Sequence, residues 1–357
     1  MGRPAVGFVA WSQLSGREAE IAEALGGQAR CVYPRRLAGR PLAPLRYAVS
    51  ALATAGYLAR HRPRAVIATN PPVFPGLLAL AYGRLAGAPV LLDSHPSSFG
   101  AKDDRLSAWL LPVHAWLARR VTATLVTAEE WVRQVAAWGG RGEIVHEAPS
   151  GWDQSLASRA SGMPPRALPD RPVVLFAGVF AADEPVAEVV EAARRLPGVQ
   201  VHVTGDPARC PRSVRAAAPA NVSFVGLLAE PEYRRALQEA DLVLALTTEP
   251  TSVMRVAYEA VYAGQPLVTS DWPVLTELFP HAVHVANHAE AIAAGLAEAL
   301  RRHAELSAAC PAAAAAQRAR WQGQLAALRD LTGTATPAPG RPARGWPGRR
   351  RGLGTGG

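Results

Sequence analysis

The sequence predicts an α/β protein of two domains, each built around a parallel β-sheet. Short apolar runs alternate with longer helical stretches through the first half of the chain, a stretch rich in Pro, Ser and Gly follows, and the alternation then starts again. Continuous apolar runs are typical of strands buried on both faces of a parallel sheet. Two such series joined by one linker indicate two Rossmann-like domains that face each other across a cleft.

The predicted boundaries follow these changes in composition. They give a first domain at residues 1–150, a linker at 151–171, a second domain at 172–331 and a disordered basic tail at 332–357. The strands of the first domain are expected at residues 5–10, 29–33, 65–69, 89–94, 123–127 and 143–147, with helices at 16–25, 45–60 and 106–120. The strands of the second domain are expected at residues 173–178, 199–205, 222–226, 241–246, 266–270 and 282–285. Right-handed crossovers place the carboxyl ends of the strands, where ligands bind, on one side of each sheet.

Composition and charge exclude several classes of function. The formal net charge is +9, but five arginines lie in the tail, and about +4 remains without them. This mild excess does not predict a nucleic-acid partner. The only lysine, Lys102, stands in GAKDDR, which matches neither a Walker-A loop nor a Schiff-base site. The three cysteines, Cys31, Cys210 and Cys310, have no metal-binding spacing and indicate a reducing compartment.

The sequence favours a cytoplasmic location. Its N-terminus lacks the apolar core of a signal peptide, and no apolar run reaches the roughly 18 residues of a spanning helix. Residues 33–64 form an apolar helix with arginines at both ends, a pattern that suits peripheral docking on an anionic membrane such as the inner face of the plasma membrane. A core helix with solvated arginine ends has the same pattern.

The segment TEPTSVMRVAYEAVYAGQPLVTSDWP carries the clearest signal for a binding site. A helix is expected to start at Thr251 or Ser252, each a good N-cap, and to end at the glycine of YAGQP. Ser252, Arg255 and Glu259 then share one helix face, next to a helix N-terminus that can bind phosphate. Arg255 can add a charged contact to that phosphate, and Glu259 can accept two hydrogen bonds from a sugar diol. The alternative is an exposed Arg255–Glu259 pair, worth about 0.3–0.5 kcal/mol.

Two strand-end loops of the first half carry further candidates. Asp93 and His95 follow a predicted strand in LLDSHP. His95 can transfer a proton or bind a sugar hydroxyl while Asp93 orients its ring, and a loop histidine without a catalytic role is the alternative. Asn70, in TNPP at the end of another strand, is a candidate contact to an acceptor substrate.

The turn after the first strand is the third such loop. Ser15, Gly16 and Arg17 lie there, where a phosphate or an acceptor can bind. Ser15 is also a candidate helix cap, with Glu18 completing a capping box. This turn has no G-x-G-x-x-G motif, which argues against a dehydrogenase.

The segment EPTSVMRVAYEAVYAGQPLVTSDWPVLTEL resembles the donor-site segment of GT-B glycosyltransferases of the family-4 type. That segment typically reads Glu-Gly-Phe-Gly-Leu-Pro-x-x-Glu-Ala-x-Ala-x-Gly-x-Pro-Val-Val, followed by Glu-Leu or Glu-Ile. The matching residues are Glu259, Ala260, Ala263, Gly264, Pro266, Val268, Glu277 and Leu278. The resemblance covers most of the chain, including VVLFAG, which is similar to the strand that opens the donor domain. More locally, the stretch from VIATNPP to LLDSHP is similar to the dolichol-pathway β-mannosyltransferases.

The resemblance implies a hexosyltransferase-like enzyme that moves a sugar from a nucleotide-diphosphate sugar to an acceptor hydroxyl. The expected acceptor is lipid-linked or a precursor of a cell-surface polysaccharide. Glu259 would bind the ribose hydroxyls, and the backbone from Ser252 to Arg255, with Thr251 and Gly178, would hold the diphosphate or the donor sugar. The resemblance implies no metal and no cofactor, because the helix dipole and Arg255 supply positive charge.

The sequence departs from the family pattern at two places. Thr251 stands where the family has its first glutamate, and the Arg and Lys that usually follow the first donor-domain strand are replaced in FAGVFAADEP by Val179, Phe180 and acids. Arg255 replaces a family leucine and can compensate for the missing cations. Two alternatives follow: a non-catalytic partner subunit of another glycosyltransferase, and a nucleotide-sugar epimerase of the same fold.

Overall fold

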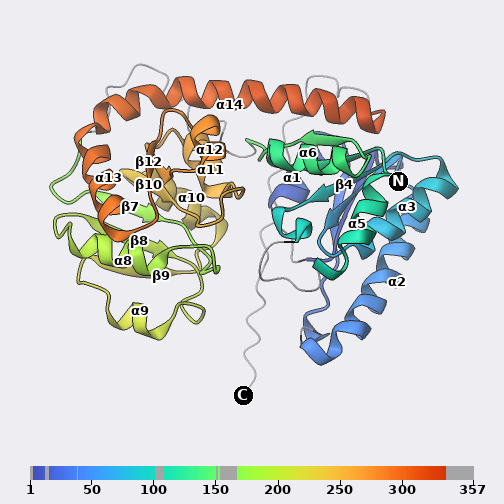
Figure 1. The fold of residues 1–357 in the computed structure, drawn as a ribbon, viewed down its shortest axis with the longest axis horizontal. Helices are drawn as coiled ribbons and strands as arrows, with labels where there is room; N and C mark the ends of the chain where they lie inside the picture. The colour runs from blue at the N-terminus through green and yellow to red at the C-terminus, as the bar shows by residue number, and fades with distance from the viewer. Residues whose placement is uncertain are drawn as a thin grey trace.

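The computed structural model describes residues 3–12, 16–37, 39–100, 108–149, 152 and 167–334. These residues form two lobes, each with a six-stranded parallel sheet between helices (Figure 1). All the strands predicted from the apolar runs are present, and each begins within one residue of its predicted start. The predicted α/β class with two Rossmann-like domains is therefore confirmed.

The first sheet has the strand order β2-β1-β3-β4-β5-β6. The order reverses between β1 and β3, and ligands of open α/β sheets bind at the carboxyl ends of strands at such a switch point. The strands are β1 (Val6–Ala10), β2 (Gln28–Cys31), β3 (Ala65–Asn70), β4 (Val90–Ser94), β5 (Ala123–Val126) and β6 (Gly142–Ile144). The helical elements are α1 (Gly16–Ala24), η1 (Arg35–Leu37), η2 (Arg40–Leu42), α2 (Ala43–His61), α3 (Phe74–Ala86), η3 (Pro96–Phe99), α5 (Leu111–Ala118) and α6 (Glu129–Ala137).

The second sheet has the strand order β12-β11-β10-β7-β8-β9 and reverses between β7 and β10. Counted from β7, this is the strand order of dinucleotide-binding α/β domains. The strands are β7 (Val173–Phe176), β8 (Gln200–Thr204), β9 (Val222–Gly226), β10 (Leu242–Ala245), β11 (Leu267–Ser270) and β12 (Val283–Val285). The helices are α8 (Val186–Arg194), α9 (Arg212–Ala216), α10 (Glu230–Glu239), α11 (Arg255–Ala263), α12 (Pro273–Leu278), α13 (Ala289–Arg301) and α14 (His303–Thr332).

Apolar side chains cover both faces of each sheet. On the first sheet, Ile21 of α1 packs in one buried cluster and Leu80 of α3 in another. On the second sheet, Ile292 of α13 and Tyr262 of α11 belong to two further clusters. Every residue of β1, β3, β4 and β5 is buried, as the continuous apolar runs predicted. Removal of this apolar surface from water is the main contribution to the stability of both sheets.

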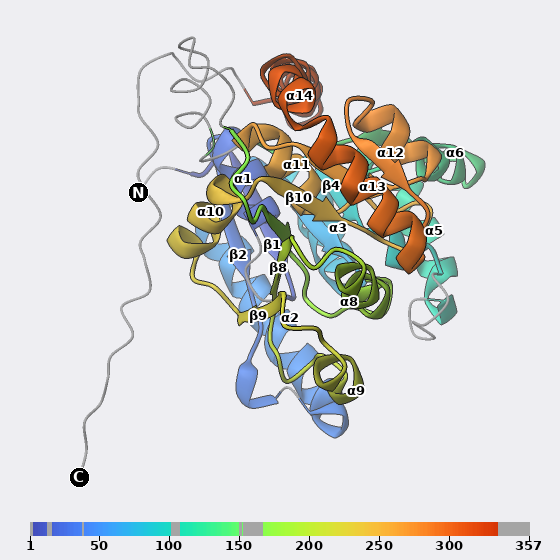
Figure 2. The same cartoon turned by 90° about the vertical axis from the view of Figure 1, so that its left-hand side faces the viewer.

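The long helix α14 bridges the two lobes, running across both in Figure 1 and seen nearly end-on in Figure 2. Its residue Ala314 packs in the core of the second sheet, whereas Trp321 and Leu328 pack in the core of the first. This return to the first domain was not predicted from the sequence. Trp152, within the predicted linker, is buried in the second core, and the rest of the predicted tail beyond position 334 lies outside the described residues.

Helix α2 lies at the edge of the first lobe, opposite α14 (Figure 1). Its buried side chains, Ser50, Thr54 and Leu58, follow a helical spacing and pack toward the sheet. Among the described helices, none is long and apolar enough to cross a membrane.

Candidate active site

A pocket of about 470 Å³ lies over the point where the strand order of the second sheet reverses. Its wall consists of the loops after β7, β8 and β9, the end of β10 and the first turns of α10 and α11. Gly178, predicted to belong to the donor site, is part of this wall. The polar side chains of the wall belong to Glu184, Thr204, Glu230, Tyr233, Arg255 and Glu259. The pocket therefore occupies the position at which open α/β sheets bind their ligands.

Helix α11 begins at Arg255, later than the predicted start at Thr251 or Ser252. Met254 is the N-cap, with extended backbone and no side-chain cap. Thr251 and Ser252 therefore lie in the preceding loop, outside the set of described residues that line the pocket. The predicted polar helix face consists of Arg255 and Glu259 alone.

Contacts between two loops explain the late helix start. The loop after β10 is tied to the loop after β7, because the backbone N of Thr248 donates to the backbone O of Asp183 at 2.7 Å. The Thr247 hydroxyl donates to the Asp183 carboxylate at 2.7 Å, and the Trp272 indole donates to the Thr247 carbonyl at 2.8 Å. These bonds satisfy the backbone outside a helix, so helical geometry starts only past this anchor.

Glu259 lies one turn into α11, with 11% of its side chain exposed. Its Oε1 accepts from Nε of Arg255 at 2.8 Å, and its Oε2 accepts from the Tyr233 hydroxyl at 2.5 Å. Burial, together with the charge of Glu259, raises the pKa of Tyr233 well above its usual value, so the hydroxyl keeps its proton and stays a donor. A carboxylate has about four lone-pair sites, so Glu259 can still accept hydroxyl groups of a ligand.

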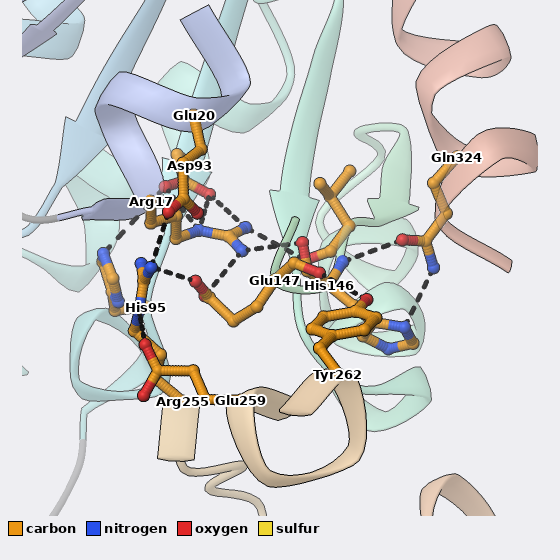
Figure 3. Close-up of polar contacts among 11 residues, drawn as sticks. Arg17, Glu20, Asp93, His95, His146, Glu147, Arg255, Glu259, Tyr262 and Gln324 are labelled. Atoms are coloured by element: carbon orange, nitrogen blue, oxygen red, sulfur yellow. Dashed lines mark hydrogen bonds and ion pairs between the residues drawn. The ribbon is translucent and has the colours of Figure 1, made fainter. Parts of the chain in front are cut away.

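Arg255 joins the two domains, as Figure 3 shows. Its Nη2 donates to Glu20 of α1 at 2.7 Å, and its Nη1 donates to Glu147, beyond β6, at 3.2 Å. The guanidinium lies against Gly16, where an added Cβ would come within 2.4 Å of Nη1. The predicted pair with Glu259 therefore forms, but it is one part of a cluster of three carboxylates between the domains and not an isolated surface pair.

Arg17, predicted to meet a phosphate or an acceptor, is buried and directed at the protein itself. Its Nε and Nη2 donate to Asp93 at 3.1 and 2.9 Å, and its Nη1 donates to Glu147 at 3.1 Å. Its remaining bonds go to the carbonyls of Val145 and His146. These contacts use all five N–H donors of the guanidinium, so the structure corrects the prediction: Arg17 is a clamp within the first domain.

His95 follows β4, and 42% of its side chain is exposed. Its Nε2 lies 4.0 Å from Oδ2 of Asp93, beyond hydrogen-bond distance, so the expected orientation of His95 by Asp93 is not made. Burial by itself would raise the pKa of Asp93, but the Arg17 guanidinium holds it below its usual range. The backbone instead places His95, because its N donates to the carbonyl of Asn70 at 2.9 Å.

Asn70 and His114 hold the loop that carries His95. Asn70 is fully buried at the end of β3, and its side-chain amide donates to the Ser94 hydroxyl at 3.3 Å. The buried ring of His114 contacts that hydroxyl at 3.0 Å and the carbonyl of Ser98 at 3.1 Å. Burial lowers the pKa of His114 to about 4, so the ring is neutral and can both donate and accept.

Comparison with known families matches both halves of the chain. The glycosyl transferase 4-like domain matches residues 7–151, and the glycosyl transferase-like domain matches residues 185–327. The chain is a GT-B glycosyltransferase of the family-4 type. No curated protein matches the sequence of this glycosyltransferase.

Solved structures support the same fold. Sucrose-phosphate synthase from Thermosynechococcus elongatus has a TM-score of 0.67 and 16% identity, over 91% of this chain and 97% of its own. Anabaena HepE, in complex with UDP and glucose, has a TM-score of 0.67 and 14% identity, over 92% and 99%. A putative UDP-N-acetylglucosamine 2-epimerase from Listeria monocytogenes has a TM-score of 0.51 and 11% identity, over 85% and 90%. These similarities establish the GT-B fold of the glycosyltransferase.

Several residues of the site were not singled out from the sequence. Glu20 and Glu147 have no motif around them, and only the meeting of the domains brings them to Arg255. No sequence motif marks Tyr233 either. The sequence does mark Glu184, because it is an acid in the stretch after Gly178 where the family has cations. Ser15 lies outside the described residues. Among the residues that the structure describes, no group of three or more His, Cys, Asp or Glu side chains is arranged to hold a metal ion.

Proposed function

We propose that this glycosyltransferase takes its sugar from a nucleotide-diphosphate sugar and transfers it to an acceptor hydroxyl. The observation that carries the proposal is the pocket over β7 and β10, in which Glu259 and Arg255 stand at the start of one helix. An acid and a cation one turn apart fit a ribose diol and a diphosphate. HepE, which shares the fold, has been solved with UDP-glucose, and this supports a nucleotide-sugar donor.

Each part of the proposed site has a defined role. Glu259 accepts the ribose hydroxyls. The N–H groups at the start of α11 and the Arg255 guanidinium stabilise the charge that develops on the leaving diphosphate, and no metal is required for this in the proposal. His95, exposed at the carboxyl end of β4, binds or deprotonates the acceptor hydroxyl once the domains close on the donor.

The test is calorimetric titration with UDP, GDP and ADP and with their 2′,3′-dideoxy forms. Glu259→Gln should lower the affinity for the preferred diphosphate about tenfold, because hydrogen bonds to a charged group are worth about 1.5–3 kcal/mol. The dideoxy form should bind both proteins equally. The matched control is Glu290→Gln on α13, which removes an exposed ion-paired glutamate of the same domain and should change neither affinity.

The two alternative functions predict different results in binding and turnover assays. If the wild type binds none of these nucleotides, the chain is a non-catalytic partner and the proposal fails. If it converts a free nucleotide-sugar to its epimer without an acceptor, it is an epimerase. An unchanged affinity in Glu259→Gln would reject the ribose assignment while leaving the nucleotide site in place.

The acceptor is proposed to be lipid-linked, or a polysaccharide precursor, presented at an anionic membrane surface. Helix α2 supports this, because its outward face is apolar: Leu45, Val49 and Leu52 are 52%, 38% and 75% exposed. No Asp or Glu occurs between Glu23 and Asp93, so the surrounding sequence is basic. The combination of an apolar face and basic flanks fits insertion between anionic headgroups.

Helix α2 also reaches the switch point of the first sheet. Thr54 on its inner face accepts a hydrogen bond from the indole of Trp11, directly after β1, at 2.9 Å. The Trp11 ring is stacked near Tyr47 of α2 and Phe74 of α3 at centroid distances of 5.8 and 6.1 Å. A membrane-bound acceptor would therefore arrive beside the carboxyl ends of β1 and β3.

Vesicle sedimentation tests the membrane contact. The double variant Leu45→Glu/Leu52→Glu should lower binding to phosphatidylglycerol vesicles at least about tenfold, since burial of each leucine is worth about 1.5–3 kcal/mol. Leu85→Glu on α3 is the control, because Leu85 is 90% exposed in the same domain but not on α2. Equal binding by the double variant and the wild type would remove α2 from the proposed interface.

A further inference from the structure

The loop after β7 is wrapped around a carboxylate of its own chain. The backbone N of Val179 donates to both oxygens of Glu184 at 3.0 Å, and the backbone N of Ala181 donates to Oε2 at 3.2 Å. Between them, Phe180 has a φ of +57°, in the left-handed region. A turn of this kind directs successive N–H groups at one point and forms an anion-binding concavity.

This concavity belongs to the donor pocket. Glu184, Gly178 and Val179 all line the pocket. An added Cβ on Gly178 would come within 2.7 Å of Oε2 of Glu184, so the carboxylate lies directly against the backbone at the end of β7. The N–H groups of Val179 and Ala181, which this turn directs at one point, are thus already bonded to an anion.

The charges of the pocket reinforce this conflict. The described residues of its wall include three acids, Glu184, Glu230 and Glu259, and one cation, Arg255. Arg255 in turn contacts three carboxylates, including Glu20 of the other domain. Burial raises the pKa of Glu184, although the loop N–H groups act against this rise. A diphosphate that enters the pocket therefore meets more negative than positive charge.

We propose that Glu184 is an internal anion that occupies the phosphate position of the β7 loop and thereby sets the affinity of the pocket for diphosphates. This inference rests on the proposed nucleotide-sugar site. A diphosphate must either displace the Glu184 carboxylate from the loop or bind beside it against charge repulsion. The remainder of the ligand, the nucleoside, does not meet this carboxylate.

The test compares UDP, GDP and ADP with uridine, guanosine and adenosine by calorimetry at fixed ionic strength. In Glu184→Gln the side-chain oxygen can still accept from the loop, but its charge is gone. The affinity for the preferred diphosphate should rise about tenfold or more, because juxtaposed like charges cost several kcal/mol, and the nucleoside affinity should stay constant. The control is Glu191→Gln on α8, an exposed glutamate paired with Arg194, which should change neither affinity.

The possible outcomes separate the role of Glu184 from the existence of the nucleotide site. Diphosphate binding that is stronger in Glu184→Gln than in the wild type, at unchanged nucleoside affinity, supports the internal anion. Equal or weaker diphosphate binding in Glu184→Gln, with binding by the wild type intact, overturns the inference and leaves the nucleotide site standing. Parallel changes in diphosphate and nucleoside affinity would assign Glu184 a structural role in the loop. Absence of binding in both proteins rejects the inference and the proposed function together.

Discussion

Arg17 and Arg255 both contact Glu147, yet they stand in different surroundings. The side chain of Arg17 is 6% exposed and binds only partners of the first domain. The side chain of Arg255 is 34% exposed and reaches from the second domain to carboxylates of the first. The first arrangement is closed within one core, whereas the second forms only where the two domains meet.

Asp93, a partner of Arg17, and Glu20, a partner of Arg255, have pKa values shifted in opposite directions. Burial would raise the pKa of Asp93, but Arg17 outweighs it and the pKa falls below its usual range. Burial raises the pKa of Glu20 to about 7, and the attraction of Arg255 does not outweigh it. The attraction of Arg17 therefore outweighs burial at Asp93, whereas the attraction of Arg255 does not outweigh burial at Glu20.

The largest expected effect comes from Arg17→Met. It leaves Asp93 buried without its partner, and loss of one member of a buried pair costs about 3–5 kcal/mol. Urea denaturation at pH 7.5 measures the fall in the free energy of unfolding. Arg141→Met is the control, since Arg141 pairs with Glu143 on the surface and should cost less than about 1 kcal/mol. A loss below about 1 kcal/mol for Arg17→Met would contradict the clamp.

A smaller effect is expected from Glu20→Gln, and it depends on pH. With a folded pKa of about 7, Glu20 holds its proton more tightly in the folded than in the unfolded chain, where its pKa is 4.5. The wild type therefore loses stability as pH rises from 4.5 to 7, by about 1.4 kcal/mol per pKa unit at most. The neutral glutamine has no such loss, so the variant should equal the wild type near pH 4.5 and exceed it by at most about 3.4 kcal/mol at pH 8, for a shift of about 2.5 pKa units.

The difference between the two urea curves isolates Glu20, because all other titrating groups are shared. Glu23→Gln, at an exposed position of the same helix, is the matched control and should change the free energy of unfolding by less than about 0.5 kcal/mol. A constant difference across this pH range would mean that Arg255 holds Glu20 as firmly as Arg17 holds Asp93.

The fold could be predicted because each strand carries its own signal. Strands buried on both faces have continuous apolar runs, and these runs can be recognised without knowing how the domains are arranged. The return of α14 to the first core could not be predicted in this way. Trp321 and Leu328 belong to an apolar helix face, but the spacing of apolar residues does not reveal against which sheet that face packs.

The site could be predicted only in part. Glu259 and Gly178 were identified from the segments around them, and both line the pocket. Arg17 was assigned to a ligand because it stands at a strand-end turn, yet the position of a residue in a turn does not reveal which donors are already used. The helix start at Arg255 was missed because the anchor between Thr248 and Asp183 joins loops that are far apart in the sequence.

The smallest effect on stability is expected from Arg255→Met. The variant should lose about 1 kcal/mol or less, because the side chain is partly exposed and such pairs contribute little. Other bonds still join the domains, including Tyr262 to the carbonyl of Glu147 at 3.0 Å and Gln324 to the backbone N of His146 at 2.9 Å. The same variant should bind the preferred nucleoside diphosphate about tenfold more weakly, while the affinity for the nucleoside stays constant.

The two arginines should differ most in the ratio of these two effects. Arg17→Met should mainly lower stability, and Arg255→Met should mainly lower diphosphate affinity. Arg255→Lys separates charge from shape, because lysine keeps the charge but cannot reach three carboxylates with a planar fork. If Arg255→Met were as unstable as Arg17→Met and bound the diphosphate normally, Arg255 would be a second structural clamp, and the phosphate contact would have to come from the N–H groups of α11 alone.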